Sequence, residues 1–256
     1  MNRASLEKEF EQYVSAYNAD DPKIRLKINH SFRVAGIAER IAAEIDGADP
    51  AFAWAVGLLH DIGRFEQVKR YNTFVDAESV DHAQFGADLL FKEGLLQNLC
   101  PGGIPENQLP LMELAIRYHS AYRIPEDLTL SETMYCDILR DADKIDIFRV
   151  LSETPFEEIY DVPMEQLRAD GVSEAVKDCF RNRTAVLREK RETSIDKIVG
   201  HICLMFELVY PVSRKIAREQ GYVDRLLAFR SDNPDTDAWF AYMRDNINLA
   251  MEERLE

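Results

Sequence analysis

The stretch Trp54-Ala-Val-Gly-Leu-Leu-His60-Asp61-Ile-Gly63-Arg64 is the most informative part of the sequence. Its first half is apolar on every side, which is typical of a helix buried in a protein core. It then reaches two adjacent side chains that can bind metal, His60 and Asp61, followed by a glycine and an arginine. A buried charge is costly unless it is paired or coordinates a metal. The sequence therefore predicts a buried helix that ends at a functional site.

The composition is that of a globular protein with a net negative charge. The chain has 256 residues, of which 46% are hydrophobic and 30% charged, and its formal net charge is −15. This acidity argues against nucleic acid and anionic membranes as general partners, because both require a basic surface. The N-terminal segment lacks the apolar region of a signal peptide, and no apolar stretch reaches transmembrane length. The four scattered cysteines indicate reduced thiols, so a soluble cytoplasmic protein is expected.

Hydrophobic periodicity predicts helices along the whole chain, without an alternating strand pattern. The expected helices cover roughly residues 6–17, 28–45, 50–61, 79–93, 106–118, 131–151, 164–168, 173–190, 194–220 and 236–254. Pro211 is expected to kink the ninth of them, and residues 63–78 are expected to form a polar connection. The predicted fold class is all-α. An N-terminal helix (1–24) would pack on a metal-binding helical domain (25–151), which a C-terminal helical extension (152–256) follows.

Several further side chains along the chain can join His60 and Asp61 in binding metal. In order, the candidates are His30, His60, Asp61, His82, His119 and one aspartate among Asp141, Asp143 and Asp146. Apart from the adjacent pair, each lies on or at the end of a different expected helix, as in metal sites built inside helical bundles. Imidazole and carboxylate ligands suit iron, manganese, cobalt, nickel or zinc. The predicted cofactor is therefore a divalent transition metal.

The order of these ligands resembles that of the HD-domain superfamily of metal-dependent phosphohydrolases, in its six-ligand, two-metal branch. The resemblance extends from about residue 25 to 150, and not to the last hundred residues. It rests on five motifs in the family's order, namely His30-Ser-x-Arg33-Val34-Ala, Leu58-Leu-His-Asp-Ile-Gly, His82-x-x-x-Gly86-Ala, Ile116-Arg-Tyr-His119 and Ala142-Asp143-Lys-Ile-Asp. The fold it implies is an HD-domain helical bundle with a C-terminal helical extension.

The resemblance also implies a division of labour among the ligands. The first metal would take His30, His60, Asp61 and Asp143, and the second would take His82, His119 and a bridging oxygen of Asp61. Helical periodicity alone does not choose among the late aspartates, and only the family's Ala-Asp-Lys/Arg pattern favours Asp143. Asp141 and Asp146 are then expected to support a ligand or to lie at the surface.

The reaction implied is water attack on a phosphoester or phosphoanhydride of a small phosphorylated molecule, with nucleotides among the candidates. Two divalent ions against two carboxylates leave a formal charge of about +2, which would attract an anionic substrate. Phosphate oxygens would bind the metals, and a hydroxide held by the metals would attack phosphorus. Arg33, Arg64 and Lys144 are the expected substrate-binding residues; Asp61, Arg64 and Lys144 are the expected catalytic ones.

Three alternatives remain open at the level of sequence. His82 and His119 could contact phosphate or protonate a leaving group in a one-metal site. The same six ligands also occur in the superfamily's mixed-valent di-iron oxygenases, the myo-inositol-oxygenase-like proteins. A third possibility is a non-catalytic module that binds a nucleotide.

The C-terminal hundred residues carry weaker signals. His201 lies on an apolar helix outside every motif, so we expect a core or interface histidine. The aromatic and methionine-rich run at residues 204–210 is interpreted as core packing rather than pocket lining. The C-terminal helices could also support a homodimer.

Overall fold

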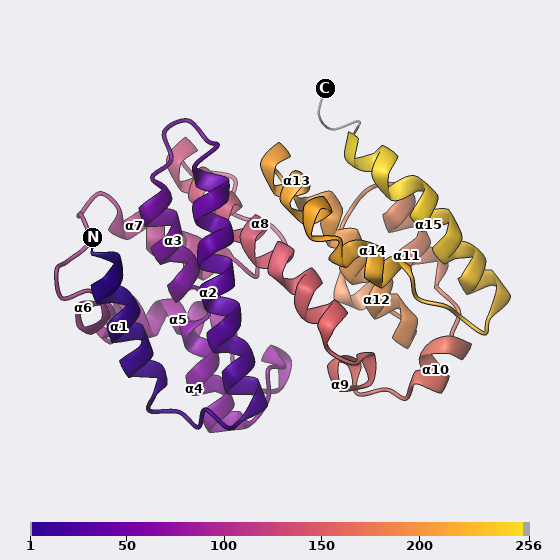
Figure 1. Cartoon of the computed structure of the whole chain (residues 1–256), viewed down its shortest axis with the longest axis horizontal. Coiled ribbons are helices and arrows are strands. Elements are labelled where there is room, and N and C mark those ends of the chain that lie inside the picture. The colour runs from indigo at the N-terminus through magenta and orange to yellow at the C-terminus, as the bar shows by residue number, and fades with distance from the viewer. Residues whose placement is uncertain (1, 253–256) are drawn as a thin grey trace. The chain divides into compact units, whose positions relative to one another are not determined.

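The computed structural model describes residues 2–252, with side chains up to residue 247. Over these residues the fold is entirely helical and contains no strand, which confirms the all-α prediction. The chain divides into two compact units, and the division falls directly after Asp143, inside helix α8 (Leu130–Glu153) (Figure 1). Residues 1 and 253–256, including the expected helix end at Arg254, lie outside the described residues.

The first unit is built around the pair formed by α2 (Pro22–Ala42) and α3 (Pro50–Leu59), which run side by side (Figure 1). The two backbones approach closely at Gly57, because a Cβ at that position would lie 2.8 Å from Cα of Ala35. Only a residue without a side chain permits this approach. As a result, the rings of His30 on α2 and His60 at the end of α3 lie edge to face, with centroids 5.2 Å apart.

Other helices pack around this pair. They are α1 (Arg3–Val14), α4 (Ile62–Tyr71), α5 (His82–Phe91), α6 (Leu95–Leu99) and α7 (Leu109–Tyr118), with a short 3-10 turn η1 (Asp76–Glu78). α1 buries Leu6, Phe10 and Val14. Phe10 packs edge to face against Phe32 of α2 and Phe65 of α4. The N-terminal helix is therefore a packed part of the first unit.

Residues 63–78 were expected to be a polar connection, and this expectation is wrong because α4 occupies the first part of the stretch. Phe65 and Val68, spaced i and i+3, are buried, whereas Lys69 and Arg70 are exposed. The helix ends at Asn72, whose φ of 54° is left-handed. Glu66, Lys69 and Arg70 share the solvent-facing side of this amphipathic helix, where Glu66 pairs with both cations. These charged residues obscure the helical period in the sequence.

The helix that carries His30 begins earlier than residue 28. The side chain of Asp21 accepts a hydrogen bond from the Lys23 amide, and Pro22 occupies the first helical turn. The expected break around residues 18–22 is therefore the N-terminal cap of α2. The longer helix places Lys27 one turn before His30.

The second unit contains shorter helices. They are α9 (Phe156–Tyr160), α10 (Met164–Ala169), α11 (Glu174–Arg181), η2 (Arg188–Lys190), α12 (Ser194–Ile202), η3 (Cys203–Glu207), α13 (Pro211–Gln220), α14 (Tyr222–Leu227) and α15 (Pro234–Glu252). α12 lies at the centre and contacts α10, α11, η3 and α14.

Two helices expected in the second unit end earlier than the sequence predicts. The helix expected over 173–190 ends at Arg181, and an irregular segment follows it. The helix expected over 194–220 is divided, because Pro211 begins α13 at its first turn rather than kinking a continuous helix. The four cysteines are free and buried, as expected for packed thiols. Among the described residues, no helix combines the length and the apolar character that a membrane span requires.

Candidate metal centre

The structure brings all six sequence-predicted ligands together in the first unit. His60 follows the last residue of α3, and Asp61 precedes the first residue of α4, so the adjacent pair occupies a junction between two helices. His30 lies within α2, His82 begins α5, and His119 follows α7. Asp143 comes from α8. All are buried except Asp143, whose side chain is 14% exposed.

Asp61 lies at the centre of the cluster, and its two carboxylate oxygens face different pairs of histidines. Oδ2 lies 3.6 Å from Nε2 of His30 and 3.5 Å from Nε2 of His60. Oδ1 lies 3.5 Å from Nε2 of His82 and 3.7 Å from Nε2 of His119. The carboxylate therefore separates the cluster into two half-sites.

Asp143 belongs to the first half-site. Its Oδ1 lies 3.1 Å from Nε2 of His30 and 3.7 Å from Nε2 of His60. The ligand atoms of these three residues also lie within 4.8 Å of one another, close enough to hold one ion. The side chains of Asp141 and Asp146 are buried instead of lying at the surface, which removes the surface role considered for them.

Backbone hydrogen bonds fix the orientation of two imidazoles. Nδ1 of His60 lies 2.7 Å from the carbonyl oxygen of Gly57, and Nδ1 of His119 lies 2.7 Å from that of Ile116. A carbonyl can only accept, so each Nδ1 must carry the proton. The lone pair is then on Nε2, which faces the centre of the cluster. This is the form of histidine that binds a metal.

His82 is oriented in the same way by a carboxylate. Its Nδ1 donates to Oδ2 of Asp76 at 2.7 Å, while its Nε2 lies 3.0 Å from Nε2 of His119. Two nitrogen lone pairs this close repel each other unless a proton or a cation lies between them. Burial lowers the pKa of His82 to about 4, which disfavours the proton near neutral pH. The second half-site therefore suits a cation.

The two carboxylates are held in their ionised form. Burial by itself would raise the pKa of Asp61, but the Lys27 ammonium and the surrounding histidines outweigh it and hold this pKa well below the usual range. Burial would likewise raise the pKa of Asp143, and the neighbouring imidazoles of His30 and His60 hold it well below that range. Metal ligands must be deprotonated, so both carboxylates are ready to bind.

Unsatisfied polar atoms complete the test of whether these residues fit a metal. Within the described part of the chain, Nε2 of His60 and Oδ1 of Asp61 are buried without a hydrogen-bond partner. Each such atom costs about 1–3 kcal/mol, and native structures seldom leave one without a reason. A divalent cation would satisfy both atoms. The donor set of imidazole nitrogens and carboxylate oxygens fits a first-row transition metal.

Two residues at the site were not predicted from the sequence. Lys27 forms an ion pair with Oδ2 of Asp61. Its position three residues before His30 on one helix could have indicated it, if the true start of α2 had been recognised. Asp76 binds Nδ1 of His82 and also accepts from Nη1 of Arg64 at 2.8 Å. Asp76 comes from η1, and only tertiary folding brings it to the site.

The expected substrate-binding residues have different surroundings. Arg64 lies at the site, with Nε 3.7 Å from Oδ1 of Asp61. Its Nη1 donates to Asp76 and to the Phe74 carbonyl. These hydrogen bonds fix the segment that follows α4. Arg33 follows His30 by one turn of α2 and is half-buried, and Lys144 is buried directly after Asp143. Substrate contact by these three cations stays a prediction.

A second cluster, formed by Asp76, Asp81 and His82, supports the same site. The ligand atoms of the three residues lie within 4.8 Å of one another. Asp81, however, caps α5 by accepting hydrogen bonds from the amides of Ala83 and Gln84. Since Asp76 occupies Nδ1 of His82, the cluster positions this histidine rather than forming a separate metal site.

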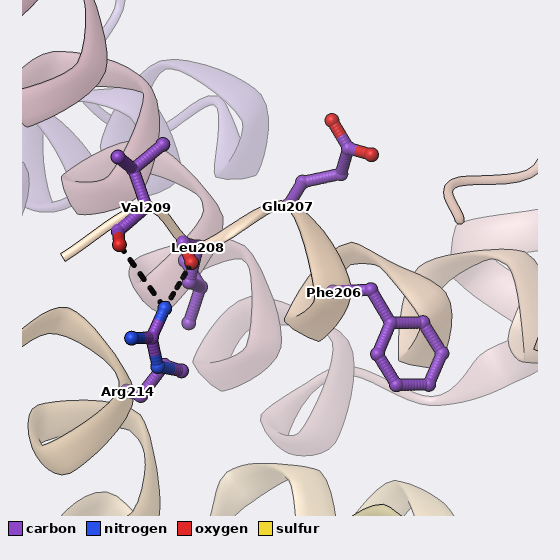
Figure 2. Close-up of a pocket in the computed structure, with 5 residues that line it drawn as sticks. All are labelled: Phe206, Glu207, Leu208, Val209 and Arg214. Atoms are coloured by element: carbon purple, nitrogen blue, oxygen red, sulfur yellow. Dashed lines mark hydrogen bonds between the residues drawn. The ribbon is translucent and has the colours of Figure 1, made fainter. Parts of the chain in front are cut away.

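The second unit contains an open pocket of about 340 Å³ (Figure 2). Its lining consists of Phe206, Glu207, Leu208, Val209 and Arg214. The run at residues 204–210 therefore borders a pocket, although Met205, Phe206 and Leu208 are also buried as core residues. Figure 2 shows the Arg214 guanidinium donating to the carbonyls of Leu208, at 2.7 Å, and Val209, at 3.1 Å. These bonds hold the irregular segment before α13.

His201 lies outside the metal cluster. Its Nδ1 is hydrogen-bonded to the hydroxyl of Tyr160 at 2.7 Å, and the two rings are stacked. Burial, together with the charges of Arg191 and Arg188, lowers the pKa of His201 to about 3. This neutral, packed histidine agrees with the structural role expected for it.

Comparison with known proteins adds one finding. No curated protein and no solved structure gives a significant match. Proteins of the HD domain family bind divalent metals, and most of them are metal-dependent hydrolases. The model of the HD domain family matches residues 28–149, just under half of the chain, and this match supports placing that part of the chain in the HD superfamily.

Proposed function

We propose that the first unit is a phosphohydrolase with two divalent metals, acting on a small phosphorylated molecule. One observation carries the proposal. The two oxygens of Asp61 face separate histidine pairs, at 3.5–3.6 Å on one side and 3.5–3.7 Å on the other. A carboxylate shared in this way reduces the repulsion between two neighbouring cations. A purely structural aspartate has no need of four imidazole nitrogens around it.

Each half-site would hold one ion. His30, His60, Asp143 and Oδ2 of Asp61 would hold the first, and His82, His119 and Oδ1 of Asp61 would hold the second. When bound, divalent metals polarise a phosphoryl oxygen and lower the pKa of water. Asp76 would accept a hydrogen bond from the protonated Nδ1 of His82, which leaves the lone pair of Nε2 available for the metal.

The charge of the site supports an anionic substrate. The chain carries a net charge of −15, so an anion needs a local positive region. Lys27 and Arg64 both lie beside Asp61, with side chains 15% and 13% exposed. We propose that Arg33, Arg64 and Lys144 contact phosphate oxygens that the metals leave free, because guanidinium and ammonium groups pair well with phosphate. Nucleotides are the first substrates to test.

The test is hydrolysis by metal-loaded protein. The purified chain would be stripped with a chelator, reloaded separately with Mn²⁺, Fe²⁺, Co²⁺, Ni²⁺ or Zn²⁺, and assayed for products of a panel of phosphomonoesters, phosphodiesters and nucleotides. Turnover that needs metal and disappears in His30→Ala and His82→Ala is expected. His201→Ala is the matched control, since His201 lies outside the cluster and should leave turnover intact.

Three results would contradict the proposed phosphohydrolase activity. Metal-loaded protein that cleaves no member of the panel would contradict the proposed hydrolase. A mixed-valent iron EPR signal with substrate-dependent oxygen uptake would replace it with an oxygenase. Tight nucleotide binding without turnover would indicate a binding module.

A further inference from the structure

Lys27 forms an ion pair with Asp61, the central ligand of the predicted metal site. Its ammonium pairs with Oδ2 of Asp61, the oxygen that also faces His30 and His60. The Lys27 side chain is 15% exposed and that of Asp61 is 2% exposed, so both groups are largely shielded from solvent. At this depth the attraction between unit charges is much stronger than in bulk water.

A metal in the first half-site would need the same oxygen. His30, His60 and Asp143 enclose one side of that half-site, and Oδ2 of Asp61 is the remaining carboxylate oxygen that faces it. An ammonium and a divalent ion that share one oxygen repel each other. Binding of the metal therefore has to weaken or displace the contact with Lys27.

We propose that Lys27 is a built-in competitor of the first metal: it neutralises Asp61 when no metal is bound and limits the affinity of the metal. This inference rests on the proposed metal centre. It predicts that removing the ammonium raises the affinity for the first metal and lowers the stability of the metal-free protein. A lysine that merely supports the ligand would have the opposite effect on affinity.

Phe74 provides a position to which the ammonium can move. The Lys27 ammonium lies 5.5 Å from the centre of the Phe74 ring, within the range of a cation–π contact. The Arg64 guanidinium lies 5.6 Å from the same ring. The ammonium would therefore keep the aromatic face as a neighbour after its contact with the carboxylate is lost. The chain thus offers the displaced ammonium a favourable alternative.

The test compares Lys27→Met with the wild-type chain. Lys27→Met keeps the length and apolar body of the side chain and removes its charge. Lys23→Met is the matched control, because Lys23 lies one turn earlier on α2 and binds the carbonyl of Asn72 instead of Asp61. Lys27→Arg retains the positive charge. Each protein would be stripped with a chelator, titrated with Mn²⁺ by calorimetry, and melted in the continued presence of chelator.

Lys27→Met should bind the first Mn²⁺ at least tenfold more tightly than the wild type, a change of about 1.4 kcal/mol. Its melting temperature in chelator should fall by at least about 4 °C, because the buried Asp61 loses its partner. Lys27→Arg and Lys23→Met should stay within threefold of the wild-type affinity.

Unchanged or weaker Mn²⁺ binding by Lys27→Met would overturn the inference, and so would an unchanged melting temperature in chelator. If the wild-type chain itself bound no Mn²⁺, Fe²⁺ or Zn²⁺, the proposed function would fail instead. The two failures are therefore distinct.

Discussion

Gly63 gives the sharpest test of how the fold holds the two half-sites together. It is the second residue of α4, two positions after Asp61, and it packs against the start of α5. A Cβ at Gly63 would lie 2.5 Å from the carbonyl oxygen of His82, 2.7 Å from the amide nitrogen of Gly86 and 2.9 Å from its Cα. All three atoms belong to backbone, so rotation of a side chain cannot relieve the overlap.

The substitution Gly63→Ala should therefore move α5 away from α4. Favourable contacts between heavy atoms lie near 3.5–4.0 Å, so the helices must separate by roughly 1 Å. Overpacking of this kind costs about 1–3 kcal/mol, partly offset by the better helix propensity of alanine. The shift would also carry His82 away from Asp61, so the second metal should bind at least tenfold more weakly than in the wild type.

Urea unfolding in chelator measures the stability, and calorimetric titration with Mn²⁺ measures the affinity. Gly36→Ala is the matched control. Gly36 is exposed on α2, and its added Cβ would meet no atom within 4 Å. This control should gain about 0.5–1 kcal/mol of stability and keep the wild-type affinity. If Gly63→Ala matched Gly36→Ala in both measurements, the reasoning from close packing would be refuted.

Three further predictions concern the carboxylate behind His82, the histidine of the second unit, and metal removal. Asp76→Asn should weaken binding of the second metal about 10–100-fold in calorimetry, since the amide holds His82 less firmly. The control is Glu78→Gln, because Glu78 lies on the same turn and is exposed. Equal affinities of the two variants would contradict the role of Asp76. The pKa of His201 is about 3 in the folded protein, whereas a histidine in the unfolded chain takes up a proton near pH 6.5. The free energy of unfolding should therefore decrease as the pH falls below 6.5. Urea unfolding at pH 7 and pH 5 should show this contribution, about 2 kcal/mol, disappearing in His201→Gln, and an identical pH dependence in both proteins would argue against it. Chelator should lower the melting temperature of metal-loaded protein, and re-addition of metal should restore it; an unchanged melting temperature would show that the cluster binds no stabilising ion.

The fold class could be predicted because the sequence repeats the helical period almost throughout. The sequence-based prediction fails for the segment after the central motif, where the charged residues Glu66, Lys69 and Arg70 favour a loop over the helix α4. The helix there is held by Phe65 and Val68, whose burial depends on the packing of α1 and α2 around them. Pro211 is ambiguous in the sequence for a related reason, since a proline fits either a kink or a first helical turn, and it begins α13.

The candidate ligands could be identified by residue type and spacing, but their supporting contacts could not. Periodicity alone did not separate Asp143 from Asp141 and Asp146, because α8 is buried on more than one side. The structure places Asp143 beside His30, at 3.1 Å. Asp76 reaches His82 only through the turn at residues 76–78, and no local pattern encodes that contact.

The central claim is that Asp61 joins two metal ions in one chain. The most direct measurement is the number of metal ions per chain, determined by elemental analysis of stripped, reloaded and desalted protein. The wild type should hold two ions, and Asp61→Ala should lose both, because each half-site depends on one oxygen of that carboxylate. A wild-type value of one ion per chain, unchanged in His82→Ala and His119→Ala, would contradict the account.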